Sequence, residues 1–291
     1  MLLNKPHQRQ IRMVSTDSLQ HGYPTITNSD EWWARAEKII PGGASLLAKT
    51  PSQWTKGVAP KYLKKGRGAR VWDVDGQEYL DYTMGVGPVV LGYTYPAVDD
   101  AIRAQLEDGI TLSLVHPLEV EVSERLHNML PNAEMVRFSK TGADVCSAAV
   151  RLARAHTGRE HVLCCGYHGW HDWYIGLTAR NGGVPQAVQN LTNTFPYNNL
   201  EALEKALDDT VACVIIEAVA FQKPEPGYLQ EVVNLCRKNG TVVVFDEMWT
   251  GFRLAPGGVQ EFFDVQPDLC VYSKAIANGM PLSAIVGRAD I

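Results

Sequence analysis

The sequence predicts an α/β protein built on a mostly parallel β-sheet that helices flank on both sides. Continuous apolar runs, such as residues 211–216 and 241–245, indicate strands that are buried on both faces. Amphipathic segments with helical periodicity alternate with these runs, as the connections between parallel strands do. With 291 residues, of which 45% are hydrophobic and 20% charged, the chain is long enough to bury a substantial core.

The composition argues against several other classes of protein. The chain has 27 basic and 32 acidic residues, and its net charge of −5 gives no overall attraction for nucleic acid or anionic lipid. No apolar run approaches the roughly 18 residues that a membrane span requires. Six cysteines in a chain of this length do not suggest a disulfide framework. The chain also starts without an apolar secretory segment, so we expect a cytoplasmic protein.

The first 95 residues are expected to form two parts. Residues 1–28 lack a steady apolar period and are interpreted as an N-terminal tail. Ser29 or Asp30 is expected to cap a helix over residues 31–40. Alternating apolar residues around an Asp-Gly pair predict a β-hairpin over residues 71–82.

Residues 96–291 are expected to form the main domain. Helical periodicity predicts helices over residues 97–106, 118–130, 144–156, 200–207 and 229–238. Short apolar runs predict strands over residues 135–138, 161–165, 211–216, 241–245, 269–272 and 284–286. Parallel sheets bind ligands beyond the carboxyl ends of their strands, so the residues that follow each strand are the candidates for a site.

Small residues follow the strand at 135–138 and open a helix. The backbone N–H groups of Thr141, Gly142 and Ala143 are expected to point at an anion such as a phosphate, because the first turn of a helix leaves them unbonded. An ordinary capped helix start has the same residues.

An aromatic-rich loop follows the strand at 161–165. It contains Tyr167 and His168, and it suits a flat ligand that needs a stacking partner. A purely structural aromatic cluster is the alternative. Cys164 and Cys165 lie close to two histidines, but no CxxC pair or HExxH pattern is present, so we expect no metal site.

Charged residues follow three further strands. Glu217 and Asp246 each come directly after an apolar run, where a carboxylate is costly to bury unless a cation meets it. Lys274 follows the run at 269–272, and burial there would make its amine a nucleophile. A phosphate cup, a stacking ring, an acid for a ring cation and an amine for an imine are together the parts that hold pyridoxal 5′-phosphate.

With these residues in place, the chain resembles the class-III aminotransferases, a pyridoxal-phosphate group of fold type I. Within that group it resembles the glutamate-1-semialdehyde 2,1-aminomutases and their transaminase relatives. The resemblance runs from about Trp33 to Ile291. It rests on an ordered series of motifs: Pro41-Gly42-Gly43, residues 71–76 and 79–82, Leu91-Gly92, residues 151–155 and 157–159, Tyr167-His168-Gly169, residues 245–253, Ser273-Lys274 and Asn278-Gly279.

The resemblance implies a role for each candidate residue. Lys274 would form the internal aldimine and carry the proton, and Asp246 would pair with the protonated ring nitrogen. The remaining cofactor-binding positions would hold the phosphate (Thr141, Gly142 and Ala143), stack on the ring (Tyr167, with His168 beside it) and line the pocket (Glu217 and Met248).

The resemblance also implies an organisation. Residues 96–291 would be the large cofactor-binding domain, incomplete at its C-terminus, and residues 29–95 would belong to a small domain. The partners would be a small-molecule amino donor, a carbonyl acceptor and a second copy of the chain in a homodimer.

Residues on the substrate side depart from the aminomutase pattern. Ala143 stands in place of a threonine and Val86 in place of a tryptophan, and residues 44–50 contain no arginine. These departures favour a transaminase that moves an amino group from a donor to a carbonyl acceptor, with an aminomutase as the alternative. Family members continue well past the lysine, so the chain resembles a truncated member. An inactive cofactor-binding protein is therefore the alternative from another class.

Overall fold

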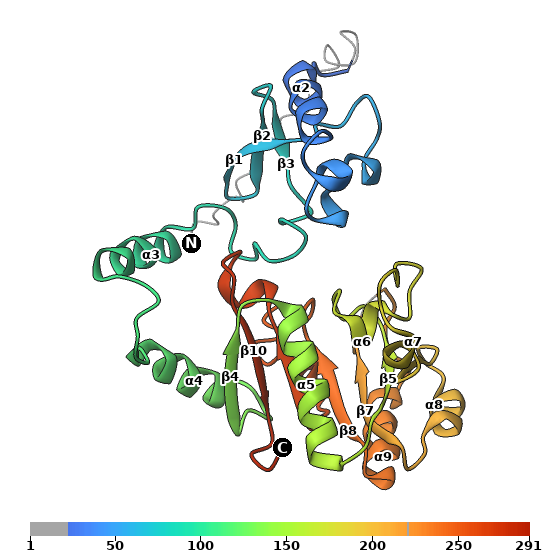
Figure 1. The fold of residues 1–291 in the computed structure, drawn as a ribbon. Coiled ribbons are helices and arrows are strands. Elements are labelled where there is room, and N and C mark those ends of the chain that lie inside the picture. Colours follow the sequence, from blue (N-terminus) through green and yellow to red (C-terminus); the bar gives the residue numbers. More distant parts are fainter. Residues whose placement is uncertain (1–22, 220) are drawn as a thin grey trace, which may run out of the picture. The chain divides into compact units, whose positions relative to one another are not determined.

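The computed structural model describes residues 23–219 and 221–291, and the chain divides into two compact units after Tyr82 (Figure 1). Most of the expected N-terminal tail, residues 1–28, lies outside the described residues. The sequence placed the start of the large domain at residue 96, and those domain boundaries stay a prediction.

The first unit combines one helix with a small antiparallel sheet. α2 (Thr27–Ala36) is followed by three short 3-10 helices at Pro41–Gly43, Leu47–Lys49 and Pro51–Gln53. The sheet has the order β1 (Leu63–Arg67), β2 (Arg70–Asp73), β3 (Glu78–Leu80). The hairpin is confirmed, because β2 pairs antiparallel with β3 across Gly76, which has a φ of 88° that favours glycine. β1 escaped sequence analysis because its basic residues show no apolar alternation.

The expected helix is present, but α2 begins and ends four residues earlier than the predicted range of 31–40, so those bounds were wrong. The carboxylate of Asp75, in the hairpin turn, accepts the N–H groups of Asn28 at 2.8 Å and Ser29 at 3.0 Å. These are first-turn donors that the helix itself leaves unbonded. Neither Ser29 nor Asp30 caps the helix, because a carboxylate from a distant part of the chain satisfies its first turn.

The second unit is an α/β fold, and each helix and strand predicted for it is present with ends shifted by about two residues or less. Its helices are α3 (Pro96–Asp108), α4 (Pro117–Met129), α5 (Gly142–Thr157), α6 (Asp172–Ile175), α7 (Gln186–Gln189), α8 (Leu200–Ala206), α9 (Tyr228–Asn239) and α10 (Gly258–Phe262). Its strands are β4 (Met135–Ser139), β5 (His161–Cys165), β6 (Thr192–Thr194), β7 (Val211–Ile216), β8 (Val242–Asp246), β9 (Leu269–Tyr272) and β10 (Ser283–Gly287).

The seven-stranded sheet has the order β4-β10-β9-β8-β7-β5-β6. Neighbouring strands from β9 through β6 pair in parallel, whereas β10 pairs antiparallel with both β9 and β4. The predicted mostly parallel sheet is therefore confirmed. Apolar runs indicate burial but not direction, so the reversed strand β10 was not distinguished from the others.

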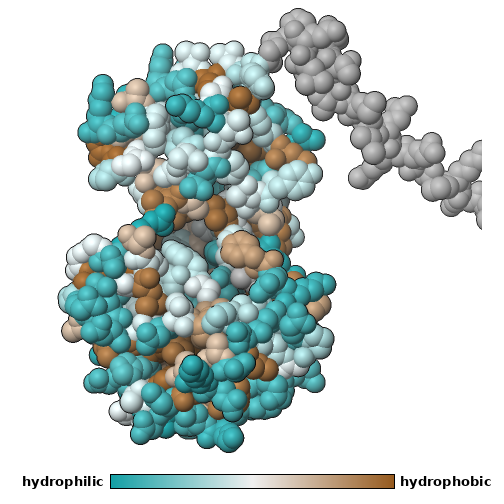
Figure 2. All heavy atoms as spheres, turned by 90° about the vertical axis from the view of Figure 1, so that its right-hand side faces the viewer, coloured by the Kyte–Doolittle hydropathy of each residue, from teal (hydrophilic) through white to brown (hydrophobic). Residues whose placement is uncertain are grey.

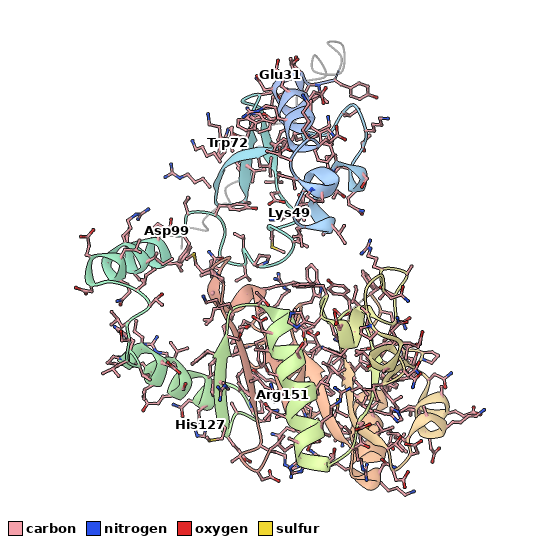
Figure 3. All side chains as sticks on the ribbon, viewed as in Figure 1. Glu31, Lys49, Trp72, Asp99, His127 and Arg151 are labelled. Carbon is pink, nitrogen blue, oxygen red and sulfur yellow. The ribbon has the colours of Figure 1, made fainter. Side chains whose placement is uncertain are left out.

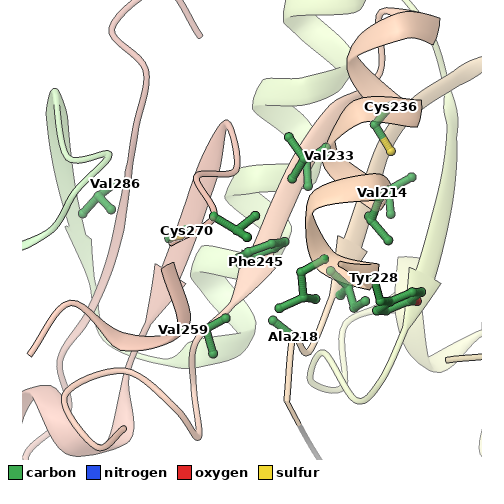
Figure 4. Close-up of a cluster of buried hydrophobic side chains, with 14 of the residues drawn as sticks. Val214, Ala218, Tyr228, Val233, Cys236, Phe245, Val259, Cys270 and Val286 are labelled. Carbon is green, nitrogen blue, oxygen red and sulfur yellow. The ribbon is translucent and has the colours of Figure 1, made fainter. Parts of the chain in front are cut away.

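Successive residues of the central strands pack on opposite faces of the sheet. On one face, α5 packs against residues such as Val244 and Val271. On the other face, α8 and α9 pack around Phe245 and Cys270 (Figures 1 and 4). Burying a large apolar side chain stabilises a fold by about 1.5–3 kcal/mol, so strands buried on both faces form the rigid centre of this unit.

Hydrophilic side chains cover most of the outer surface in the view of Figure 2, with hydrophobic ones scattered between them. Among the described helices, none is both long and apolar enough to cross a membrane.

Candidate active site

Four adjacent parallel strands end at the same edge of the large sheet, and the candidate residues follow them. Asp246 is the last residue of β8, and Glu217 comes directly after β7. Lys274 follows β9 after one intervening serine, and the loop with His168 follows β5. The order β9-β8-β7-β5 therefore brings together residues that are far apart in the sequence.

Asp246 is a buried carboxylate with defined partners, and its residue is only 2% exposed. Its Oδ1 accepts the N–H of Met248 at 3.0 Å. Its Oδ2 lies 2.8 Å from Nδ1 of His168 and 3.6 Å from the thiol of Cys146. A carboxylate oxygen only accepts hydrogen bonds, so Nδ1 and the thiol are the donors.

His168 lies deeper than the sequence suggested, packed against aromatic side chains behind Asp246. Its ring is stacked with that of Trp173, with 6.2 Å between the ring centres, and makes an edge contact with Tyr174, with 5.5 Å between the ring centres. Its Nε2 atom is buried and has no hydrogen-bond partner within the described part of the chain. Tyr167, by contrast, is 58% exposed, so of these two residues only Tyr167 has a ring that is accessible to a ligand.

Glu217 shapes the loop after β5. Its Oε2 accepts the N–H of Tyr167 at 2.9 Å. A Cβ atom on Gly166 would lie 2.6 Å from that oxygen, and Gly166 has a φ of 115°, so only glycine fits there. Burial raises the pKa of the Glu217 carboxyl, and the nearby charge of Asp246 adds to the effect.

Lys274 has an unusual backbone and an unusual amine. It opens a short 3-10 helix with a φ of 47°, a left-handed conformation that a side chain disfavours. Burial lowers the pKa of its amine to about 8, although Asp246 and Glu217 favour the charged form. Its Nζ atom lies 3.4 Å from the centre of the Trp249 ring.

The N-terminus of α5 faces the same edge of the sheet. Thr141 and Asp144 form a capping box, in which the Thr141 hydroxyl accepts the N–H of Asp144 and the Asp144 carboxylate accepts the N–H of Thr141. The backbone N–H groups of Gly142 and Ala143 have no acceptor within the helix, because the first turn of a helix leaves its N–H groups unbonded. Arg151, farther along this helix, is exposed and distant in sequence from its start (Figure 3).

Glycine is required at two points near this helix start. A Cβ on Gly142 would lie 2.7 Å from the sulfur of Met248, and one on Gly169 would lie 2.7 Å from the Cβ of Ala143. The sequence-predicted phosphate residues, Met248 and the aromatic loop are therefore packed together.

Sequence analysis missed three residues of this region. Cys146 was not among the candidate residues, yet its thiol contacts Asp246. Glu247 and Trp249 sit in the segment after β8, and nothing in their spacing distinguished them. Cys146, His168 and Asp246 place ligand atoms within 4.8 Å of one another, as a metal site would. Burial raises the pKa of the Cys146 thiol well above its usual value. The hydrogen bonds that Cys146 and His168 donate to Asp246 explain why these three side chains lie together.

The chain matches the sequence model of a known family, described as aminotransferase class-III, over residues 53–291. It is 34% identical over 275 residues to the 3-aminobutyryl-CoA aminotransferase of Cloacimonas acidaminovorans, covering 91% of this chain and 66% of that protein. It is 37% identical over 289 residues to the glutamate-1-semialdehyde 2,1-aminomutase of Desulforamulus reducens, covering 92% of this chain and 66% of that protein.

Among solved structures, the fold is similar to the FumI protein of Sphingopyxis sp. MTA144, solved in its pyridoxal-phosphate internal aldimine form. The TM-score is 0.85 and the identity 30%, over 91% of this chain and 65% of that one. The chain therefore spans just under two thirds of the length of these relatives.

Proposed function

This chain belongs to the class-III aminotransferase family, and from that premise we propose that it is the cofactor-binding part of a transaminase. The proposed reaction moves an amino group from a small-molecule donor to a carbonyl acceptor. The observation that carries the proposal is the partly buried Lys274 amine, whose pKa is lowered to about 8, at the edge of the sheet where Asp246 and Glu217 also lie.

The family uses pyridoxal 5′-phosphate, and the residues present here fit that group. Asp246 offers a buried carboxylate that two donors to its Oδ2 hold in place. The negative charge of this carboxylate suits a cationic ring nitrogen. The amides of Gly142 and Ala143 suit a phosphate. The hydroxyl of Thr141 accepts one hydrogen bond in the capping box and keeps its own proton to donate to that phosphate.

Pyridoxal phosphate supplies an aldehyde that takes up an amine and a ring that stabilises the electron pair left when a substrate carbon loses its proton. The protein supplies the positions and the protons. Lys274 would hold the cofactor through its aldehyde, and its amine, when free, would take the proton from the substrate carbon and return it to another carbon. A pKa of about 8 keeps a useful fraction of that amine unprotonated near neutral pH.

Asp246 would face the positive charge of the cofactor ring, and His168 orients that carboxylate through Nδ1. Tyr167 presents an exposed ring for stacking. Glu217 and Met248 line the site, where Glu217 fixes the loop that carries Tyr167.

An aminomutase is the alternative, and relatives of that name favour it. It would return the amino group to a neighbouring carbon of the same molecule without an external acceptor. The substitutions at Ala143 and Val86 argue for the transaminase. An inactive cofactor-binding protein is the remaining alternative.

We further propose a cytoplasmic homodimer, in which residues 29–95 contribute to a small domain and residues 96–291 form the large one. The segment from α3 to α4 supports self-association, because Leu114 is 86% exposed and Val115 is 72% exposed within an apolar stretch. Exposed apolar stretches of this kind are typical of protein interfaces.

Borohydride reduction of the chain with pyridoxal phosphate, followed by peptide mapping, tests the proposal. We expect the cofactor on Lys274, and none at that peptide in a Lys274→Ala variant. The exposed Lys205, in α8, serves as a matched control, because Lys205→Ala should leave the labelling of Lys274 intact. Labelling scattered over surface lysines would contradict the proposal and favour the inactive alternative.

A second assay separates the two enzyme activities. A transaminase given an amino donor without an acceptor converts its bound cofactor to pyridoxamine phosphate and stops. Failure of every donor tested to bleach the cofactor absorbance, with turnover of an amino aldehyde alone, would favour the aminomutase.

A further inference from the structure

The amine of Lys274 rests on an aromatic face. Its Nζ atom lies 3.4 Å from the centre of the Trp249 ring, well inside the roughly 6 Å over which a cation is attracted to a ring face. Trp249 follows β8 and Lys274 follows β9, so the contact joins the ends of two neighbouring strands.

The Trp249 ring is held in place by its surroundings within the second unit. A Cβ on Gly87 would lie 2.5 Å from this ring, so the backbone at Gly87 packs directly on it. Arg253 donates a hydrogen bond to the carbonyl of Trp249 at 2.9 Å and another to the carbonyl of Gly87. The ring is thus a fixed surface for the lysine.

The segment that supports the ring is also tied to the turn that carries the lysine. Asn278 accepts the N–H of Leu91 at 2.9 Å and donates to the carbonyl of Gly92 at 3.1 Å. The residues around Gly87 and the residues just after Lys274 are therefore connected. This connection fixes the position of the Trp249 ring relative to the Lys274 amine.

Charged groups surround the amine from several elements. Asp246 at the end of β8 and Glu217 after β7 favour its protonated form. The thiol of Cys146, on α5, stays protonated because burial raises its pKa, so it adds no charge. Burial and the guanidinium of Arg253 oppose the protonated form of the amine. The ring face of Trp249 adds to the groups that favour the cation.

We propose that Trp249 is a positioning residue that holds the Lys274 ammonium on its ring face before the cofactor binds. This inference rests on the proposed role of Lys274 as the cofactor lysine. Capture then requires the ammonium to give a proton to solvent and leave the ring. The free amine would then form a C=N double bond to the aldehyde carbon of pyridoxal phosphate as the C=O double bond breaks, and the aldehyde oxygen would leave as water with the two protons of the amine.

The sign of one measurable change distinguishes this role from simple burial. If the ring attracts the cation, its loss lowers the pKa of Lys274, by about half a unit to one unit. If the ring only excludes water, its loss raises that pKa toward the ordinary value of about 10.4.

Competitive acetylation with acetic anhydride over a range of pH, followed by peptide mass spectrometry, measures this pKa in the cofactor-free 291-residue chain. Trp249→Met keeps apolar bulk without a ring, and we expect it to lower the pKa of Lys274. Trp249→Phe keeps a smaller ring, and we expect an intermediate value. Trp72 gives a matched control, because the Nζ atom of Lys65 lies 4.7 Å from the centre of its ring (Figure 3). The Trp72→Met variant should leave the pKa of Lys274 unchanged.

An unchanged or raised pKa in both Trp249 variants would overturn the proposal. The Phe variant decides the matter alone if the Met variant does not fold, because a value equal to or above that of the parent chain refutes the role of the ring.

The rate of cofactor capture provides a second readout. A pKa lowered by about half a unit increases the free amine about threefold near neutral pH and leaves it unchanged in strong base. We therefore expect Trp249→Met to capture pyridoxal phosphate about threefold faster near pH 7 and at the parent rate above about pH 10. Slower capture at every pH would contradict the inference. Absence of any label on Lys274 in the parent chain would instead refute the proposed function.

Discussion

Replacing Glu247 by glutamine should remove a specific pH dependence from the stability of the second unit. Glu247 follows Asp246 and is 1% exposed. Its Oε1 accepts the N–H groups of Val259 at 2.7 Å and Gln260 at 3.3 Å, and its Oε2 accepts the hydroxyl of Thr250. Burial is the main cause that raises the pKa of this carboxyl from 4.5 to about 7.

The raised pKa has a defined sign and size. The folded chain binds this proton more tightly than the unfolded chain does. The resulting contribution to stability is fully present below about pH 4.5 and is lost as the pH rises through about 7. One pKa unit corresponds to about 1.4 kcal/mol, so the loss amounts to about 3 kcal/mol over this interval.

Glutamine preserves the shape of the site without the titration. Its amide oxygen can accept the N–H groups of Val259 and Gln260, and its amide nitrogen can donate to Thr250. Urea unfolding followed by tryptophan fluorescence, at several values between about pH 5 and pH 8, gives the free energy of unfolding for both proteins. As the pH rises, the free energy of unfolding of the parent chain should fall by about 3 kcal/mol relative to that of Glu247→Gln.

Comparing the two proteins cancels the titration of all other groups. Parallel pH dependences for Glu247→Gln and the parent chain would refute the reasoning, because Glu247 would then ionise as readily in the folded state as in the unfolded one.

Three further predictions follow from the site. The rate at which Lys274 captures pyridoxal phosphate, followed by absorbance, should rise about tenfold per pH unit and level off near pH 8, and levelling only near pH 10 would contradict the lowered pKa. Gly166→Ala should lower the free energy of unfolding in urea by about 1–3 kcal/mol because its Cβ would meet Glu217 at a positive φ, whereas Gly182→Ala, with open space around it, should change it little. Equal losses in the two glycine variants would count against this account. Asp246→Asn should weaken cofactor binding in equilibrium dialysis by about tenfold or more, since a charged partner is lost, and unchanged binding would argue against its role.

The course of the chain through the second unit could be predicted from the sequence because it depends on local patterns. Apolar runs and helical periods are properties of consecutive residues, and the sheet they predict is confirmed. Parallel strands also place their carboxyl ends at one edge. The sequence alone therefore indicated that Glu217, Asp246 and Lys274 lie along a common edge.

Tertiary structure alone decided the contacts that define how these residues behave. The cap on α2 comes from Asp75, the buried partners of Asp246 are Cys146 and His168, and the ammonium of Lys274 lies on the Trp249 ring. Each of these contacts joins residues at least 25 positions apart in the sequence. They depend on strand order, on the face of the sheet that each side chain takes and on side-chain rotamers, none of which a local pattern of residue types encodes.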